Sequence, residues 1–442
     1  MTDTNQKPAA LVIGAGIAGI QAALDIARAG YPVYLVEREP SVGGRMSQLD
    51  KTFPTLDCSS CILTPKMVDV GQHPLIELLT YSEIVAVEGQ AGAFRATVRK
   101  KPRYVDVEKC RGCGSCALEC RMHGRVVDTF NQGLGRRAAI YVPFPQAVPL
   151  VYTVDPQACI YLTRGVCGKT FKCKDACPAG AIDFEQKEEL VDIEVAAIIV
   201  ATGFDLMDPR RKPEFGYGVY PNVLTGLEFE RLSSASGPTA GKILIDGKAP
   251  QDVVFIHCVG SRDPHTGVSY CSRICCMYAA KHAHLVRDKL HDARITVFYM
   301  DVRAFGKGYE EFYDRVKHER VMYRRGEPSE VYKKGERLVV RAEDTLLRRT
   351  VEVEADLVVL ATAVVPRADA AAVAGLLGLQ RTPDGFFQEA HPKYRPVESN
   401  RAGVFLAGCC QGPKDIPDTV AQAKAAAASA MVVLAEAARA RA

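Results

Sequence analysis

Residues 10–37 carry the feature that most constrains the fold of this chain. Three glycines follow a short apolar run with the spacing G-x-G-x-x-G, and they are Gly14, Gly16 and Gly19. This spacing predicts a tight turn from a buried strand, Ala10–Ile13, into a helix over Ile20–Ala29, with room for a pyrophosphate against the turn. A second strand over Pro32–Glu37 ends in an acidic residue suited to ribose hydroxyls. The chain therefore opens as a doubly wound α/β fold that binds a dinucleotide.

A second α/β pattern runs from about Asp252 to Thr362. Its expected elements are a strand over Val253–His257, a helix over about Tyr270–Leu290, and strands over Arg294–Met300 and Ala355–Leu360. A second nucleotide-binding domain would place a glycine motif directly after its first strand. Here the residues are Cys258–Arg262, and no other G-x-G-x-x-G occurs in the sequence. The nicotinamide cradle is therefore predicted to be replaced by a cysteine-bearing segment.

Further segments are similar to those with which flavoproteins of the glutathione and thioredoxin reductase type contact FAD. They are Gly43-Gly44-Arg45, the Thr202-Gly203 pair that ends the strand Val195–Ala201, and Leu406–Gly408 before the last helix, expected from about Thr419. A plain NAD-binding domain leaves these segments unexplained. The predicted FAD-binding residues are Gly14, Gly16, Gly19, Glu37, Arg38, Gly43, Gly44, Arg45, Thr202, Gly203 and Gly408.

The sequence has 16 cysteines, which occur in tight groups, and no secretory signal at its start. This pattern favours metal ligation in a reducing cytoplasm over a secreted disulfide scaffold. The net charge of +4 is small for 442 residues and gives no indication of a nucleic-acid partner. No run of about 18 apolar residues occurs, so no membrane span is expected.

Two cysteine groups lie between residues 103 and 185. The first has the bacterial ferredoxin spacing C-x2-C-x2-C-x3-C and consists of Cys110, Cys113, Cys116 and Cys120. The second is more loosely spaced and consists of Cys159, Cys167, Cys173 and Cys177. In two-cluster ferredoxins the fourth cysteine of each run ligates the other cluster, so Cys120 and Cys177 are expected to exchange. A zinc site is the alternative for the second group.

A third group has the spacing C-x12-C-x3-C-C and consists of Cys258, Cys271, Cys275 and Cys276. Its last three members are expected at a helix start, close to the end of the strand that precedes Cys258. Their position where a nicotinamide cradle would lie favours a cluster, and buried inert thiols are the alternative. About three [4Fe–4S] clusters are therefore expected in all.

Two cysteine pairs remain. Cys58 and Cys61 follow the Gly43-Gly44 segment, where disulfide reductases place a redox-active pair. A flavin-linked dithiol, cluster ligation and structural burial all stay open for them. Cys409 and Cys410 have no assigned role.

The predicted fold is an α/β flavoprotein with two dinucleotide-binding domains, similar to glutathione and thioredoxin reductases, and an inserted α+β ferredoxin-like domain. Residues 1–102, 186–245 and 366–442 are assigned to the FAD-binding domain, 103–185 to the two-cluster insertion, and 246–365 to a degenerate NAD(P)-type domain that carries a cluster motif.

Together these motifs resemble the HdrA family, the flavin-carrying A-type subunits of heterodisulfide reductase. The resemblance rests on residues 12–19, 52–61, the cysteine insertion, 258–262, 270–277 and 408–418. It implies a cytoplasmic oxidoreductase subunit that passes electrons between clusters and FAD, in many members by electron bifurcation. It also implies partners of the B and C subunit type, or hydrogenase and formate dehydrogenase modules, and it allows a homodimer.

Larger family members have an additional N-terminal domain and a ferredoxin run beyond Val420, and this sequence has neither. This difference weakens the expectation of the same partners and of bifurcation. The alternative function is a free-standing disulfide or sulfur reductase using Cys58 and Cys61. Lys281, five residues after Cys276, is a candidate for reaching the flavin ring, and a solvent-facing lysine is the competing interpretation.

Overall fold

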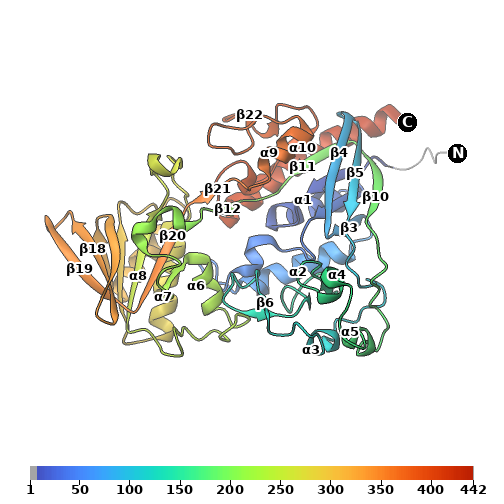
Figure 1. Ribbon diagram of the computed structural model, residues 1–442. Helices are drawn as coiled ribbons and strands as arrows, with labels where there is room; N and C mark the ends of the chain where they lie inside the picture. Colours follow the sequence, from blue (N-terminus) through green and yellow to red (C-terminus); the bar gives the residue numbers. More distant parts are fainter. Residues whose placement is uncertain (1–6, 442) are drawn as a thin grey trace.

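The computed structural model describes residues 7–441 and is built around two α/β units (Figure 1). The first unit has a seven-stranded sheet of order β22-β23-β24-β11-β1-β2-β3. Its strands are β1 (Ala10–Ile13), β2 (Val33–Glu37), β3 (Ile76–Thr80), β11 (Ala197–Val200), β22 (Glu389–His391), β23 (Arg395–Ser399) and β24 (Val404–Leu406). The five strands from β24 to β3 are parallel, and β22 and β23 add an antiparallel edge.

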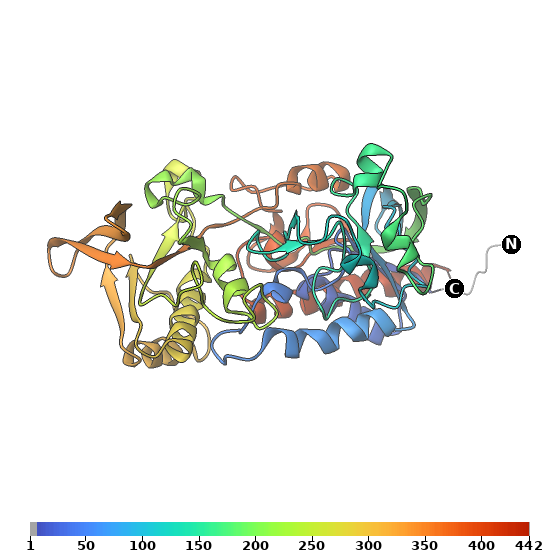
Figure 2. The ribbon, with the colours of Figure 1, turned by 60° about the horizontal axis from the view of Figure 1, so that its bottom comes forward.

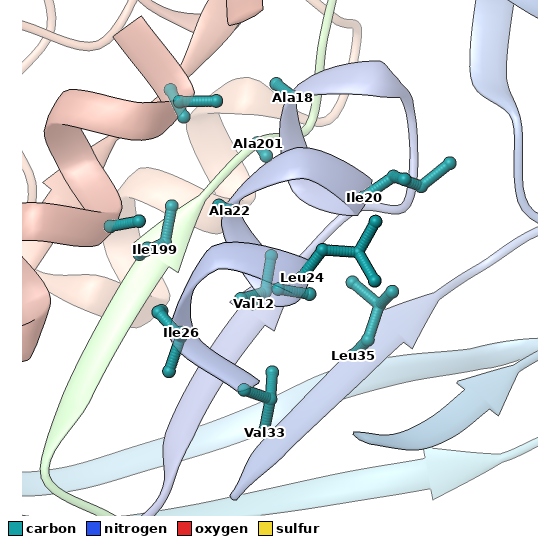
Figure 3. Packing of buried hydrophobic residues seen from close by; sticks show 14 of the residues in the cluster. Val12, Ala18, Ile20, Ala22, Leu24, Ile26, Val33, Leu35, Ile199 and Ala201 are labelled. Carbon is teal, nitrogen blue, oxygen red and sulfur yellow. The ribbon is translucent and has the colours of Figure 1, made fainter. Parts of the chain in front are cut away.

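Helices α1 (Ile17–Arg28), α2 (Ser59–Gln72) and α10 (Ile416–Arg441) belong to the same unit. Val12, Leu24 and Ile199 meet in a dry core between β1, α1 and β11 (Figure 3). Helix α1 begins three residues earlier than predicted, with Gly16 as its N-cap. Gly19 therefore lies inside the helix, where an added Cβ would be 1.8 Å from the Gly14 carbonyl oxygen. The glycine is needed for close packing of helix and turn.

Among residues 7–441, α10 is the one helix long and apolar enough to meet the criteria for a membrane span. Core helices of globular proteins meet the same criteria. In this structure α10 packs on α1 and on β11, and Ala423, Ala427 and Leu434 on its inner face are fully buried. The absence of a membrane span stays a prediction.

The second unit has a five-stranded parallel sheet of order β13-β20-β14-β15-β16. Its strands are β13 (Val223–Thr225), β14 (Asp252–Val259), β15 (Arg294–Tyr299), β16 (Val321–Arg325) and β20 (Leu357–Thr362), and its helices are α6 (Gly226–Ser233), α7 (Cys275–Lys289) and α8 (Tyr309–His318). Helix α7 begins at Cys275 and not near Tyr270, since Arg273 has a left-handed backbone with φ of 62°. Cys271 therefore lies in the preceding loop.

Sheet order also bears on the predicted boundary at residue 246. The sequence assigns β13 and α6 to the FAD-binding domain, but β13 pairs with β20 and lies in the second sheet. The other predicted boundaries stay predictions.

Smaller sheets complete the two units. β4 (Ser82–Gln90), β5 (Ala93–Lys100) and β10 (Glu189–Val195) form an antiparallel sheet beside the first unit. β17 (Pro328–Lys334), β18 (Arg337–Asp344) and β19 (Arg349–Ala355) form another at the far end of the second. β12 (Asp205–Leu206) pairs with β21 (Val364–Val365) between the units, and α9 (Ala370–Leu377) follows. Figure 2 shows the second unit at one end of an elongated molecule.

The cysteine-rich insertion lies beside the first unit. It contains short elements only: α3 (Ser115–Leu118), α4 (Ile160–Arg164), α5 (Lys172–Asp175) and two hairpins, β6 (Val126–Val127) with β7 (Arg136–Arg137) and β8 (Ile140–Tyr141) with β9 (Thr153–Val154). A bridge between Val105 and Ile182 joins its two ends. Its own small core includes Cys116, Cys159 and Ile140. The ferredoxin-like identity of this segment stays a prediction.

Candidate functional site

A cavity of about 870 Å³ opens at the carboxyl ends of β1, β2 and β11. Its walls come from the first unit, from the insertion and from α6 and α7 of the second unit. Ligand sites of open α/β sheets lie at this edge, and the volume is at the upper end of the usual range of about 300–1,000 Å³. The cavity is therefore the candidate dinucleotide site.

The glycine turn shapes one wall. Gly14 has φ of 98°, and a Cβ there would lie 2.5 Å from the Ala201 carbonyl oxygen. Gly44, which begins the 3₁₀ helix η1 (Gly44–Gln48), approaches Gly16 so closely that its Cβ would be 2.9 Å from the Gly16 Cα. Both glycines line the cavity beside the N-terminus of α1, whose free N–H groups and positive dipole end suit a pyrophosphate.

Glu37 lines the cavity at the end of β2, as its predicted ribose-binding role requires. Its carboxylate accepts hydrogen bonds from Ala15 N at 2.7 Å and Glu39 N at 2.9 Å. Burial raises the pKa of Glu37, although these two N–H groups oppose the shift. The side chain is thus fixed in place beside the glycine turn.

Most of the other predicted FAD residues also line this cavity. Those that do are Gly14, Gly16, Glu37, Arg38, Gly44, Arg45, Thr202 and Gly203. Gly19, Gly43 and Gly408 lie behind the wall and shape it. Gly408, for example, has φ of 76°, and its Cβ would be 3.0 Å from that of Ala18 on α1. The residues present fit a dinucleotide such as FAD.

The opposite wall carries a buried group of titratable side chains, Glu230, Lys281 and His282. Of these three, only Lys281 is a candidate site residue from the sequence. Lys281 donates hydrogen bonds to the Glu230 carboxylate and, at 2.9 Å, to the Lys51 carbonyl oxygen. His282 Nε2 lies 2.6 Å from the same carboxylate. Burial alone would raise the pKa of Glu230, but Lys281 and His282 hold it at about 2. Lys281 is therefore a buried, paired cation that lines the cavity and not a solvent-facing one.

A hairpin loop of the insertion covers part of the cavity. Phe130 lines it and stacks on Phe144, with ring centroids 4.9 Å apart. Arg231, which is 1% exposed, stacks on Phe130 and donates through Nε to Asn131 Oδ1 at 2.9 Å. Arg231 is not identifiable from the sequence, because α6 has no motif to mark one arginine as buried.

The eight insertion cysteines gather in two sets. Burial, followed by the charges of Cys177, Cys110 and Cys113, raises the pKa of Cys116 to about 12. Burial, followed by the charges of Cys120, Cys159 and Cys167, raises the pKa of Cys173 to about 11.

The second of these sets lines a small cavity of its own. The exchange expected for a two-cluster ferredoxin would use the same two sets, and it stays a prediction. Within residues 7–441, no three Cys, His, Asp or Glu side chains converge as they would on a single metal ion. The ligand roles of these cysteines stay predictions.

The third cysteine group lies between β14 and α7. Cys258, Cys275 and Cys276 are buried together, and Cys271 is half-buried in the loop before α7. Hydrogen bonding from Cys275 lowers the pKa of Cys276, and His257 adds to the shift. Both ring nitrogens of His257 are buried without a hydrogen-bond partner among the described residues. Such orphaned nitrogens fit a further group bound beside these thiols.

Tyr278 connects this cysteine group with the large cavity. Its aromatic side chain packs against the cluster that the three buried thiols form with Ala361, and it also lines the cavity. The same ring lies on Gly226, where a Cβ would be 2.9 Å from the ring. One aromatic side chain therefore contacts both the thiols and the candidate dinucleotide site.

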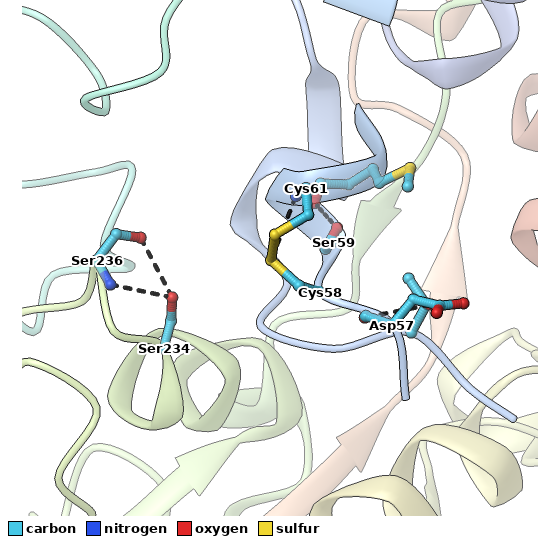
Figure 4. Close-up of a disulfide and its surroundings, with 8 residues drawn as sticks. Asp57, Cys58, Ser59, Cys61, Ser234 and Ser236 are labelled. Carbon is cyan, nitrogen blue, oxygen red and sulfur yellow. Dashed lines mark hydrogen bonds between the residues drawn. A yellow bond between two sulfur atoms is a disulfide. The ribbon is translucent and has the colours of Figure 1, made fainter. Parts of the chain in front are cut away.

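Cys58 and Cys61 form a disulfide at the start of α2, with Cα atoms 5.2 Å apart (Figure 4). Cys58 is the N-cap, and its Sγ accepts from Cys61 N at 3.2 Å. Neither residue lines the large cavity, and Cys61 is exposed. The structure therefore does not place this pair in contact with a ligand of the cavity. The functional role of the pair stays open.

Cys409 and Cys410 are buried thiols with local partners. Cys410 Sγ donates to the Val200 carbonyl oxygen at 3.2 Å, and Cys409 Sγ donates to that of Lys414 at 3.4 Å. Burial raises the pKa of Cys410 to about 11. Cys409 also lines the large cavity.

Comparisons with known proteins agree with this geometry. Residues 10–59 match the family model described as FAD dependent oxidoreductase. The chain is 56% identical over 431 residues to an A-type iron–sulfur subunit of CoB–CoM heterodisulfide reductase from Methanopyrus kandleri, covering 96% of this chain and 64% of the relative. It is 53% identical over 427 residues to the A-type subunit of the H(2):CoB-CoM heterodisulfide,ferredoxin reductase of Methanothermobacter marburgensis, covering 96% of this chain and 63% of the relative.

A third relative, from Archaeoglobus profundus, is named as a protein like the A-type subunit of heterodisulfide reductase. It is 47% identical over 473 residues, and the match covers 98% of this chain and 67% of the relative. The chain thus spans about two thirds of the length of the curated relatives it matches. Among solved structures, thioredoxin reductase of T. acidophilum has a TM-score of 0.52 at 12% identity, covering 96% of this chain and 97% of that one. The enzyme from Lactococcus lactis has the same TM-score at 14% identity, covering 97% and 100%. These two likenesses show the fold alone.

Proposed function

The chain belongs to the HdrA family of heterodisulfide reductase subunits, and from this membership we propose that it passes electrons between FAD and [4Fe–4S] clusters as part of a larger complex. FAD and iron–sulfur clusters are its cofactors, as the FAD oxidoreductase match and the iron–sulfur subunit names of its relatives support. The observation that carries the proposal is the cavity wall at Tyr278, where one side chain contacts both the FAD cavity and the third cysteine group.

Bound FAD accepts electrons in pairs and releases them singly, which lets it exchange electrons with one-electron clusters. The residues of this chain hold it between two walls. The α1 N-terminus and Glu37 orient the pyrophosphate and the ribose, while Phe130 and Phe144 cover the cavity with apolar surface and exclude water. On the far wall Lys281 is held by Glu230 and by the Lys51 carbonyl oxygen, and its third ammonium proton would be available to bound FAD.

The insertion supplies the other part of the proposed chain of carriers. We assign Cys110, Cys113, Cys116 and Cys177 to one cluster, and Cys120, Cys159, Cys167 and Cys173 to another. We assign Cys258, Cys271, Cys275 and Cys276 to a third cluster, nearest to the flavin. The insertion hairpin at Phe130 brings this segment against the FAD cavity, so the insertion is proposed to exchange electrons with the flavin.

Partners and bifurcation form the finer part of the proposal. The names of the relatives include hydrogen, formate and ferredoxin as reactants of those proteins. We propose that this chain assembles in the cytoplasm with B- and C-type subunits or with hydrogenase or formate dehydrogenase modules, and that a homodimer is an alternative assembly. Electron bifurcation at its flavin is part of the same proposal.

A second candidate function rests on the disulfide at α2. Because Cys61 is exposed and the Cys58 sulfur accepts an N–H at a helix start, a partner dithiol could exchange with this pair. The chain would then be a flavin-dependent disulfide or sulfur reductase.

The test is cofactor content, measured on anaerobically purified chain. About one FAD and about 12 iron atoms per chain are expected. Cys116→Ser, Cys173→Ser and Cys275→Ser should each remove about four irons and leave the flavin in place. Full flavin with only about four irons in the unmodified chain would overturn the two-cluster insertion. Proteins that co-purify with the chain would identify its partners.

A further inference from the structure

Six arginines and lysines line the FAD cavity, and they differ in how their charge is balanced. Four of them form ion pairs: Arg38 with Asp369, Arg45 with Asp205, Arg367 with both of these aspartates, and Lys281 with Glu230. Lys51 and Lys414 have no ion pair among residues 7–441. Of these two, Lys414 lies next to the start of α10, and burial lowers its pKa.

The ammonium of Lys414 is held in a fixed position. It donates to the side-chain oxygen of Gln411 and to the Gly412 carbonyl oxygen at 3.2 Å. Gln411 is held in turn, since its amide donates to Glu389 at 2.8 Å. An ammonium has three donors, so one donor of Lys414 stays available to a ligand in the cavity.

The neighbouring acid, Asp415, makes no ion pair with Lys414. Asp415 also lines the cavity, but one of its oxygens accepts the Tyr309 hydroxyl at 2.5 Å and the other accepts Asp418 N at 2.8 Å. The positive end of the α10 dipole adds to the Lys414 charge at this point. This part of the cavity therefore holds a lysine that has no ion pair among residues 7–441.

The position of Lys414 along the cavity decides which part of FAD meets this charge. The ribose next to adenine belongs at Glu37 and the pyrophosphate at the N-terminus of α1. The remaining half of the dinucleotide must extend beyond α1, into the region lined by Lys414, Thr52, Tyr278 and Lys281. That half ends in the isoalloxazine ring, which gains negative charge on reduction.

We propose that Lys414 is a positioning and charge-stabilising residue for the flavin ring, whose added negative charge on reduction it would balance. The inference deepens the proposed function but rests only on FAD binding by this chain, not on its partners or clusters. The Lys414 ammonium would make the flavin easier to reduce, because the reduced, anionic ring would form an ion pair with it.

Sulfite provides a probe of this charge that does not depend on turnover. It adds to N5 of an oxidised flavin and leaves negative charge on the pyrimidine side of the ring, so its affinity reports a cation there. Sulfite titration of the FAD-loaded chain, followed by loss of flavin absorbance under anaerobic conditions, is the primary measurement. FAD affinity is measured in parallel from flavin fluorescence.

Lys414→Met should weaken sulfite binding by about tenfold or more and leave FAD affinity within about threefold. Lys414→Arg should retain most of the sulfite affinity, since it keeps the charge. Lys424→Met, at an exposed lysine of α10 that pairs with Asp25, is the matched control and should behave like the unmodified chain.

An unchanged sulfite affinity in Lys414→Met overturns the proposal, as does a wild-type flavin that does not bind sulfite. Loss of FAD affinity in both Lys414→Met and Lys414→Gln also overturns it, because the charge would then serve the pyrophosphate. A chain that binds no FAD at all in any variant contradicts the proposed function itself, which separates the two failures.

Discussion

At the scale of single residues, the Glu230–Lys281–His282 group shows how a buried charge is retained in this fold. All three side chains are at most 3% exposed, and the carboxylate accepts from Lys281 and from Asp50 N and lies 2.6 Å from His282 Nε2. A buried pair of this kind contributes little net stability, but removal of one partner leaves an uncompensated charge. The group therefore fixes the cavity wall more than it stabilises the whole fold.

Glu230→Gln tests this directly. The substitution is expected to lower the free energy of unfolding at pH 7 by about 3–5 kcal/mol, because Lys281 is left buried without its counterion. Urea denaturation of the FAD-bound chain measures the change. Glu436→Gln, at an exposed site of α10, is the control and should stay within about 0.5 kcal/mol of the unmodified chain.

The pH dependence of the same variant has a definite sign. The fold lowers the pKa of Glu230 from 4.5 to about 2, so its contribution is present above pH 4.5 and is lost as the pH falls toward 2. The unmodified chain should therefore lose stability more steeply over this window than Glu230→Gln. Parallel curves for the two proteins would contradict the assignment of this carboxylate.

At the scale of elements, the hairpin loop between β6 and β7 is attached to the second unit by Arg231 and by Leu134, which packs against the apolar core of that unit. Arg231 on α6 donates to Asn131 of the loop, to the Gln48 carbonyl oxygen at 3.1 Å and to Ser236 Oγ at 3.1 Å. The loop carries Phe130 into the FAD cavity, and the Arg231–Asn131 hydrogen bond is one of the contacts that hold the loop there.

Arg231→Met should destabilise the chain by about 2–4 kcal/mol, since three acceptors, among them the buried Gln48 carbonyl oxygen, lose a charged donor. FAD should dissociate faster, and hydrogen exchange should increase in residues 128–132. Arg210→Met, at an exposed arginine paired with Asp208, is the matched control. Unchanged exchange in the loop would show that other contacts hold it.

The disulfide at the start of α2 allows a second element-scale prediction. Cys61→Ser should leave FAD and iron content unchanged, because neither Cys58 nor Cys61 lines the FAD cavity. With the disulfide reduced, Cys58→Ala should cost about 1 kcal/mol as the loss of an N-cap, and Cys58→Ser should recover most of it. Mass spectrometry after reduction and alkylation identifies the labelled thiols. Loss of iron in Cys61→Ser would instead reveal a ligand role.

The sequence predicts helices and strands well where backbone geometry and burial over a few neighbouring residues determine them. The strand predicted at Ala10–Ile13 is β1, because four apolar residues before a glycine turn have few alternatives. Helix starts are predicted less accurately: α1 begins within the glycine motif, and α7 begins after a left-handed residue, Arg273. Gly16 caps α1 without a side-chain acceptor, and the left-handed backbone of Arg273 belongs to a loop. The amino-acid type at these positions does not reveal either feature.

At the scale of the whole molecule, the site depends on contacts between segments far apart in sequence. The FAD motifs place eight of eleven predicted residues on the cavity wall. Arg231, Glu230 and the hairpin loop are not predictable in this way, since their roles arise only when the insertion and second unit fold against the first. Nor does any motif mark Tyr278, because its contact with both sites requires the packing of α7 on α6.

The packing around the start of α7 also predicts which electron donors can reduce the flavin. In a dinucleotide-binding unit the N-terminus of the helix after the first strand receives a pyrophosphate. Here that place, between β14 and α7, is filled: Cys275 and Cys276 are buried at the helix start, and a Cβ on Gly260 would lie 2.2 Å from the Met207 side chain. Ser261 and Ser272 close the loop with a hydrogen bond of 2.6 Å between their hydroxyls.

NADH and NADPH are therefore expected to leave the flavin of the isolated chain oxidised, because no open N–H cradle receives their pyrophosphate. A reduced ferredoxin, which donates electrons without a nucleotide site, should bleach it. Anaerobic stopped-flow absorbance of the flavin measures both reactions, with dithionite defining full reduction and a thioredoxin reductase as positive control for NADPH. Rapid stoichiometric bleaching by either nucleotide would contradict the filled cradle, and it would favour the disulfide reductase hypothesis, in which Cys58 and Cys61 receive the electrons.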